Sequence, residues 1–130
     1  MKLKKVILVD AYNTFVLSNG SIDEEIYKLL EELENTKILV TNADIEKQQK
    51  LGIVNMPYEV FTLNFNPEKT NPEYFKMFLG IYGLEPKNCI YFEHNPLAVE
   101  NANKLGIVSF HFNHEKRDLK ELKTFLETYL

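Results

Sequence analysis

The segment Val6-Ile7-Leu8-Val9-Asp10 runs directly into Ala11-Tyr12-Asn13-Thr14 near the start of the chain. The first four residues are apolar and mostly β-branched, which is typical of a strand buried on both faces of a parallel sheet. Asp10 then stands at the carboxyl end of the strand, and open α/β sheets bind their ligands at that end. We therefore expect Asp10 to face a crevice. The alternative is that Asp10 only caps the turn after the strand.

The composition is that of one globular domain spanning residues 1–130. Hydrophobic residues make up 45% of the chain and charged residues 26%, and 130 residues are enough to bury a core. A net charge of −4 disfavours a general nucleic-acid binder, which would present a basic face. The single cysteine excludes an internal disulfide.

The sequence also predicts that the protein is cytoplasmic and does not enter a membrane. No apolar run approaches the roughly 20 residues that a membrane-spanning helix needs. Lys2, Lys4 and Lys5 are not followed by the apolar region and cleavage site of a secretory leader.

Strand and helix signals alternate along the chain. Apolar, β-branched runs predict strands at 5–10, 37–41, 59–63, 89–92 and 107–112. Helical spacing and capping signals predict helices at 21–34, 44–51, 71–82, 95–105 and 118–129. The first helix carries a capping box, with Ser21 as the N-cap and Glu24 reaching back. This alternation predicts an α/β fold, namely a single doubly wound, Rossmann-like domain whose five-stranded parallel sheet has helices on both faces.

The ends of four predicted strands share one edge of the sheet and carry residues suited to catalysis. They are Asp10, Tyr12 and Thr14, then Thr41 and Asn42, then Lys69 in the following loop, and finally Glu93, His94 and Asn95. The set combines two carboxylates, a cation, and hydroxyl and amide groups that could bind an anion. Such a set suits attack by a carboxylate on a phosphoryl or alkyl centre.

These candidates also have purely structural interpretations. Thr41-Asn42 and Asn95 could serve only as helix caps. A lone lysine such as Lys69 is more often a solvated surface residue, and His94 is more typical of a polar loop than of a metal site. The charged run at 115–118 is typical of a solvated helix start.

In this order, the four strand ends resemble the four motifs of the haloacid dehalogenase-like superfamily of hydrolases. Residues 6–14 resemble the first motif and Val40-Thr41-Asn42 the second. Lys69, with Asn71-Pro72-Glu73-Tyr74-Phe75, resembles the third motif, and residues 90–107 resemble the fourth motif with its helix. The resemblance covers essentially the whole chain. It implies a phosphatase-type hydrolase in which Asp10 forms a covalent aspartyl intermediate.

The resemblance implies roles for the other candidates as well. Lys69 would steady the charge on Asp10 and on the substrate. The phosphate-binding candidates are Thr14, Thr41, Asn42 and Asn95. The substrate would be a phosphorylated small molecule or macromolecule. Magnesium would lie between Asp10, the backbone carbonyl of Tyr12 and Glu93.

Three residues depart from the family pattern. Tyr12 occupies the place of the general acid of phosphatases, and a phenol is a poorer proton donor near neutral pH than a carboxylic acid. His94 and Ala98 occupy places where further metal-binding acids are expected. Magnesium prefers oxygen ligands, so we expect it to bind weakly here. Tyr12 remains the candidate proton donor.

The intervals that hold cap domains in this superfamily are short here, so we expect a capless core with an open site, which an oligomer could close.

Two hypotheses for the function remain, a phosphatase acting through Asp10 and a catalytically degenerate binding or regulatory protein. A minor alternative is a metal-independent 2-haloacid dehalogenase, whose first motif is close to Asp10-Ala11-Tyr12-Asn13-Thr14. A receiver domain is disfavoured, because its aspartate would stand where Leu63-Asn64 lies.

Overall fold

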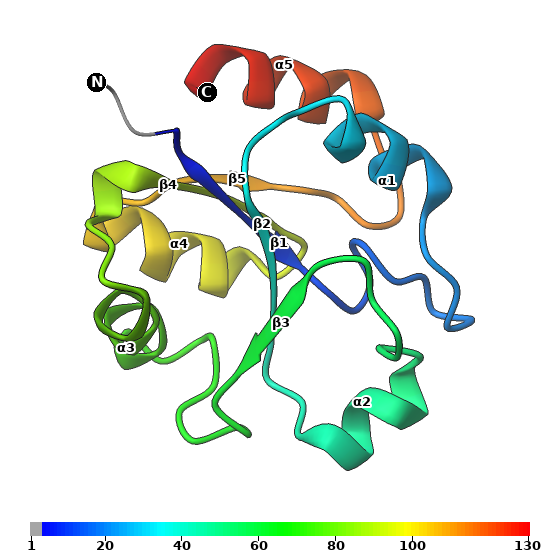
Figure 1. The fold of residues 1–130 in the computed structure, drawn as a ribbon, viewed down its shortest axis with the longest axis horizontal. Coiled ribbons are helices and arrows are strands. Elements are labelled where there is room, and N and C mark those ends of the chain that lie inside the picture. The colour runs from blue at the N-terminus through cyan, green and yellow to red at the C-terminus, as the bar shows by residue number, and fades with distance from the viewer. Residues whose placement is uncertain (1–3) are drawn as a thin grey trace.

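The computed structural model describes residues 4–130, so Lys2 lies outside the described part. Within these residues, five strands alternate with five α-helices (Figure 1). The strands are β1 (Val6–Asp10), β2 (Lys37–Thr41), β3 (Glu59–Thr62), β4 (Cys89–Glu93) and β5 (Val108–His111). The helices are α1 (Glu24–Glu31), α2 (Ile45–Leu51), α3 (Glu73–Tyr82), α4 (Pro96–Leu105) and α5 (Leu119–Tyr129). None of these helices is long and apolar enough to cross a membrane.

The strands form one parallel sheet in the order β3-β2-β1-β4-β5. From the central strand β1 the chain winds outward through β2 and β3, then crosses to β4 and continues to β5. The winding direction therefore reverses between β1 and β4, and at such a point the connections diverge and leave a crevice beyond the strand ends. Asp10 and Glu93 stand at this crevice. The predicted doubly wound, Rossmann-like sheet is confirmed.

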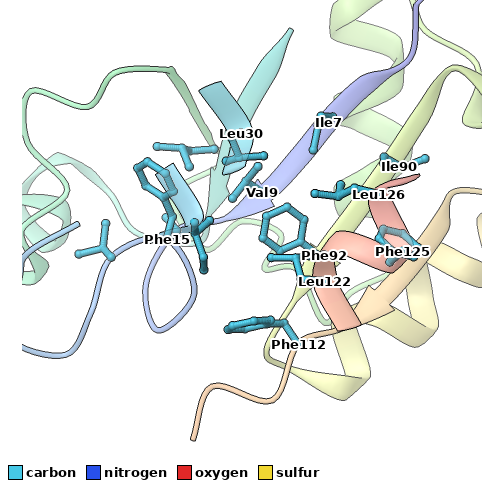
Figure 2. Packing of buried hydrophobic residues seen from close by; sticks show 14 of the residues in the cluster. Ile7, Val9, Phe15, Leu30, Ile90, Phe92, Phe112, Leu122, Phe125 and Leu126 are labelled. Carbon is cyan, nitrogen blue, oxygen red and sulfur yellow. The ribbon is translucent and has the colours of Figure 1, made fainter. Parts of the chain in front are cut away.

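Helices cover both faces of the sheet (Figure 1). Because successive side chains of a strand point to opposite faces, Ile7 and Val9 enter one core cluster and Leu8 enters the other. The first cluster packs strand residues against α1 and α5 (Figure 2), with Leu30, Phe92, Leu122, Phe125 and Leu126 among its members. The second packs against α3 and α4, with Val40, Tyr74, Phe75, Phe78, Tyr91 and Ala102 among its members. The two clusters fix the sheet from both sides.

The first helix begins later than its capping box predicts. The N-cap of α1 is Asp23, whose Oδ1 accepts hydrogen bonds from the backbone N–H groups of Glu25 and Ile26 at 3.0 and 3.1 Å. The Ser21 hydroxyl instead donates to Oδ1 of Asn19 at 2.6 Å. The helix also ends at 31 rather than 34. The other predicted elements are confirmed to within two residues.

The two connections in which a cap could be inserted contain only core elements. Within residues 4–130, the segment between β1 and β2 carries α1, and the segment from β2 to Lys69 carries α2 and β3. The predicted capless core is therefore observed.

Helices α2 and α3 both end at a glycine in left-handed backbone. Gly52 has a φ of 87° and Gly83 a φ of 65°. A Cβ atom on Gly52 would lie 2.5 Å from the carbonyl oxygen of Gly20, whereas a Cβ atom on Gly83 would meet no heavy atom within 4 Å. The contact between Gly20 and Gly52 joins the loop after β1 to the end of α2.

Gly52→Ala should therefore destabilise the protein more than Gly83→Ala. Left-handed backbone alone costs an L-residue about 1–2 kcal/mol, which sets the expected loss for Gly83→Ala. The overlap with Gly20 should add about 1–3 kcal/mol for Gly52→Ala, as overpacking typically does. Urea unfolding followed by circular dichroism measures both losses. Equal losses would show that the backbone at Gly20 moves aside freely.

Candidate active site

Asp10 and Glu93 lie close together at the centre of the sheet edge. Each is the last residue of its strand, and β1 pairs directly with β4. Both residues are buried, with exposed fractions of 1% and 0%. Two buried carboxylates repel each other and lose hydration, so the arrangement requires cations beside them.

Lys69 supplies the first cation. Its Nζ lies 2.6 Å from Oδ1 of Asp10 and 2.7 Å from Oε1 of Glu93. The interpretation of Lys69 as a solvated surface residue is wrong, because only 6% of it is exposed. Its backbone N–H donates to Oδ1 of Asn42 at 2.6 Å, which holds the loop of Lys69 against the end of β2. The lysine therefore connects three separate segments of the chain.

The opposite charges of Asp10 and Lys69 stabilise one another. Burial disfavours ionised Asp10, but the Lys69 ammonium and the hydrogen bond with His94 outweigh burial and hold the pKa of Asp10 well below its usual range. Burial also disfavours the charged form of Lys69, but the negative charges of Asp10 and Glu93 raise the pKa of Lys69 above its ordinary value. Asp10 is therefore a carboxylate at neutral pH, which is the form that can act as a nucleophile.

Thr14 supports Asp10 from the interior. Its hydroxyl donates to Oδ2 of Asp10 at 2.6 Å. Thr14 is fully buried and does not line the pocket in front of Asp10. Its hydroxyl therefore orients the Asp10 carboxylate, and the predicted contact of Thr14 with phosphate stays a prediction.

A pocket of about 210 Å³ opens onto Asp10. The other predicted site residues that line it are Tyr12, Thr41, Asn42, Lys69, Glu93 and Asn95. His94, Leu51, Ala43 and Phe65 complete the lining. The fold thus gathers nearly all of the predicted strand-end residues around one cavity, and it adds an apolar side that the strand-end pattern did not indicate.

The polar residues of the pocket also have structural partners. Thr41 Oγ1 accepts a hydrogen bond from the Ala43 N–H at 3.2 Å. Asn95 is the N-cap of α4, as expected, because its Oδ1 accepts a hydrogen bond from the Leu97 N–H at 2.9 Å. The Asn95 N–H donates to Oε2 of Glu93 at 3.0 Å. Asn95 thus combines capping with pocket lining, whereas Thr41 does not cap α2, whose N-cap is Asp44.

His94 lies in the loop directly after β4, as expected, and it belongs to the charged network. Its Nδ1 contacts Oδ2 of Asp10 and lies 3.1 Å from Oε2 of Glu93. Nε2 of His111 lies 2.9 Å from the carbonyl oxygen of His94, and the His114 ring packs edge-on against the His94 ring. In the sequence, the only signal that His94 would contact the two acids was its position directly after Glu93.

Arg117 is a second residue whose role differs from its interpretation as part of a solvated helix start. Its guanidinium donates to the carbonyl oxygen of Asn13 at 2.8 Å and to that of Thr14. It also pairs with Asp23 at 2.8 Å and lies over the Phe112 ring. Arg117 thereby clamps the loop that follows Asp10. Because Arg117 lies far along the chain from Asn13 and Thr14, no local sequence pattern indicated its contact with them.

Among residues 4–130, one group of residues could hold a metal ion. Ligand atoms of Asp10, Glu93 and His94 all lie within 4.8 Å of one another. This set fits magnesium poorly, because it contains an imidazole nitrogen and because Lys69 already binds both carboxylates. Ala98 is fully buried and supplies no further ligand.

No protein-family model and no curated protein sequence matches the chain. Solved structures do match it. A haloacid dehalogenase family enzyme from Bacteroides thetaiotaomicron, in complex with magnesium and inorganic phosphate, has a TM-score of 0.73 and 14% identity, over 92% of this chain and 98% of that chain. The core domain of a candidate phosphoglycolate phosphatase from Streptococcus pneumoniae has a TM-score of 0.61 and 20% identity, over 98% of each chain. With the strand order described above, these matches show that the chain has the haloacid dehalogenase-like fold.

Proposed function

We propose that the protein is a phosphohydrolase that works through an aspartyl phosphate on Asp10. The observation that carries this proposal is the ionised Asp10 carboxylate, held by Lys69 and Thr14 at the wall of a small pocket. The two structural neighbours described above are a phosphate-bound enzyme and a candidate phosphatase, which supports the same chemistry.

In the first step, a carboxylate oxygen of Asp10 attacks the phosphorus of a phosphate monoester. The bond from phosphorus to the leaving oxygen breaks, and that oxygen takes up a proton. In the second step, water attacks the phosphorus of the aspartyl phosphate, which releases inorganic phosphate and restores the carboxylate. Lys69 offsets the negative charge that both steps bring next to Asp10, and electrostatic stabilisation of this kind usually contributes more to catalysis than any other single effect.

The proton for the leaving group could come from Tyr12 or from His94, since both line the pocket. His94 has the stronger claim because an imidazolium is a better acid near neutral pH than a phenol. Burial disfavours the charged imidazole, but hydrogen bonds and negative charges from Asp10 and Glu93 outweigh it and raise the pKa of His94 to about 9. The imidazolium is therefore the dominant form at neutral pH and can donate a proton.

Magnesium is present in the Bacteroides enzyme, and in this chain Asp10 and Glu93 offer oxygen ligands for it. Because their oxygens already bind Lys69 and contact His94, we propose that magnesium binds weakly here, and we assign no step to it. Lys69 and protonated His94 carry two positive charges beside two carboxylates, so the cluster is close to neutral without a further cation.

A second candidate function is binding without turnover. Both oxygens of Asp10 already have partners, namely Lys69 on Oδ1, and Thr14 and His94 on Oδ2. Partners on both oxygens make the carboxylate a weaker nucleophile, which favours binding over turnover. This candidate predicts phosphate binding with no release of a leaving group.

Asp10→Asn should abolish turnover of acetyl phosphate, because an amide cannot form the acyl phosphate. The matched control is Asp118→Asn at the N-cap of α5, where asparagine caps about as well as aspartate. Phosphate release is measured for both variants and the wild type, with and without magnesium. Rates that are equal in wild type and Asp10→Asn would exclude the aspartyl mechanism, and equal rates at the level of uncatalysed hydrolysis would favour binding without turnover.

Substitutions of the two proton-donor candidates should separate their roles. If His94 is the donor, His94→Asn should lower kcat for a poor leaving group such as an alkyl alcohol by about 100-fold or more, the usual contribution of general acid catalysis. Tyr12→Phe should retain much more activity on the same ester. A leaving group that needs no proton should restore activity to His94→Asn. The opposite ranking would assign the proton to Tyr12.

The stability of the fold should fall as His94 loses its proton. Its pKa is about 9 in the folded protein against 6.5 in a model compound, so protonation favours the folded state. That contribution is complete below pH 6.5 and is lost as the pH rises through about 9. Unfolding free energies below and above this window should therefore differ more for the wild type than for His94→Asn. A titration of the His94 ring by NMR checks the pKa directly, and a midpoint near 6.5 would contradict it.

A further inference from the structure

The pocket in front of Asp10 has two chemically different sides. Its floor is charged, with Lys69 and His94 beside the carboxylates. Its rim includes Leu51, from the last turn of α2, and Phe65, from the loop after β3. Ligand pockets commonly combine a few polar groups that fix orientation with apolar walls that contact the remainder of the ligand. The residues of the rim therefore indicate the chemical character of the group that is attached to the phosphate.

Phe65 is exposed although it is a large apolar residue. Its exposed fraction is 49%, and single exposed apolar residues on a protein surface need no special explanation. Phe65 differs from exposed residues such as Ile81 because it lines the pocket that contains Asp10. Burial against a ligand would remove this apolar surface from water.

The backbone holds Phe65 in an unusual conformation. Asn64 and Phe65 have φ angles of 55° and 63°, and a bulky residue in this left-handed region is rare. Such residues cost about 1–3 kcal/mol each and persist only where the surroundings enforce them. Here the Phe65 N–H donates to the carbonyl oxygen of Asn42 at 2.9 Å, and the Asn64 N–H donates to Oγ1 of Thr62 at 3.0 Å.

Asn42 connects the rim of the pocket to its floor. The backbone oxygen of Asn42 holds Phe65, and its side-chain oxygen accepts from the backbone N–H of Lys69 at 2.6 Å. The backbone at Phe65 is thus tied to the backbone at Lys69, whose side chain would bind phosphate. A ligand that bridges the two would meet a preorganised pair of contacts, which reduces the entropy lost on binding.

We propose that the pocket selects small aryl phosphates, with Phe65 as the specificity-determining residue that contacts the aromatic ring. This rests on the proposed phosphate-binding role of the floor. The pocket volume of about 210 Å³ suits a compact ligand. An aromatic ring offers a flat apolar surface to Phe65, and ring pairs contribute beyond simple burial. A polar sugar phosphate would leave this rim unused.

Binding of two non-hydrolysable phosphonates tests the proposal without any need for turnover. Phenylphosphonate and methylphosphonate share the anionic group and differ in the ring. We expect the wild type to bind phenylphosphonate about 3- to 10-fold more tightly, the range typical of one aromatic pair. Phe65→Ala should abolish this preference by weakening phenylphosphonate binding more than methylphosphonate binding, and Phe65→Tyr should retain it. Ile81→Ala on α3 is the control for loss of an exposed apolar side chain away from the pocket.

Several outcomes would overturn the proposal. They are equal affinity of the wild type for both phosphonates, a phenyl preference that survives Phe65→Ala, equal weakening of both phosphonates by Phe65→Ala, and no binding of either. The test is separate from that of catalysis. If the phenyl preference depends on Phe65 but acetyl phosphate is not turned over, the selectivity stands and the hydrolase proposal fails. Turnover of acetyl phosphate without a phenyl preference gives the reverse result.

Discussion

The ammonium group of Lys69 is the interaction on which the site depends. It lies within 2.7 Å of both Asp10 and Glu93, which end the two strands where the sheet reverses its winding. Removing one partner from a buried charge pair typically costs about 3–5 kcal/mol, because the remaining charge is left without compensation. Without this cation, two buried carboxylates would face each other at the centre of the molecule. The cation therefore allows β1 and β4 to end in acids.

The chemistry of the site follows from this constraint. A second cation, the His94 imidazolium, contacts the same two acids, so the cluster reaches approximate charge balance from its own side chains. This charge balance stabilises the ionised state of Asp10. The same cations also contact the carboxylate oxygens of Asp10. The two candidate functions differ in one respect, namely whether Asp10 can attack a bound phosphate while its partners are in place. A charged floor of this kind attracts an anion only if its cations turn toward the ligand.

Much of the fold could be predicted from the sequence because its signals are local. The β-branched runs mark the strands, and Asn95, Gly52 and Gly83 mark helix ends through their own backbone preferences. The site residues Asp10 and Lys69 could be predicted because parallel strands place their carboxyl ends at one edge. For α1, Ser21 and Asp23 are both good caps two residues apart. The Ser21 hydroxyl donates to Asn19, whereas Asp23 is held by the Phe15 carbonyl and by Arg117, and these contacts distinguish them.

The remaining site features depend on positions that are far apart in the sequence or must be known to a single residue. The role of His94 required knowing that β4 ends at Glu93, since a shift by one residue points the side chain to the other face. The burial of Lys69 required knowing that two acids converge on it. The direction of the Thr14 hydroxyl depends on the tight turn after β1, in which the Phe15 N–H returns to the carbonyl oxygen of Asp10 at 3.1 Å.

The clamp formed by Arg117 also has a consequence for the order in which the site forms during synthesis of the chain. Thr14 and Arg117 lie 103 residues apart, so a chain that grows from its N-terminus exposes the nucleophile loop long before its clamp is made. Long-range contacts of this kind form late, because they must first overcome the entropy of closing a long loop. A nascent chain on the ribosome therefore carries Asp10 in an unclamped loop, and the site matures only once Arg117 has emerged from the exit tunnel.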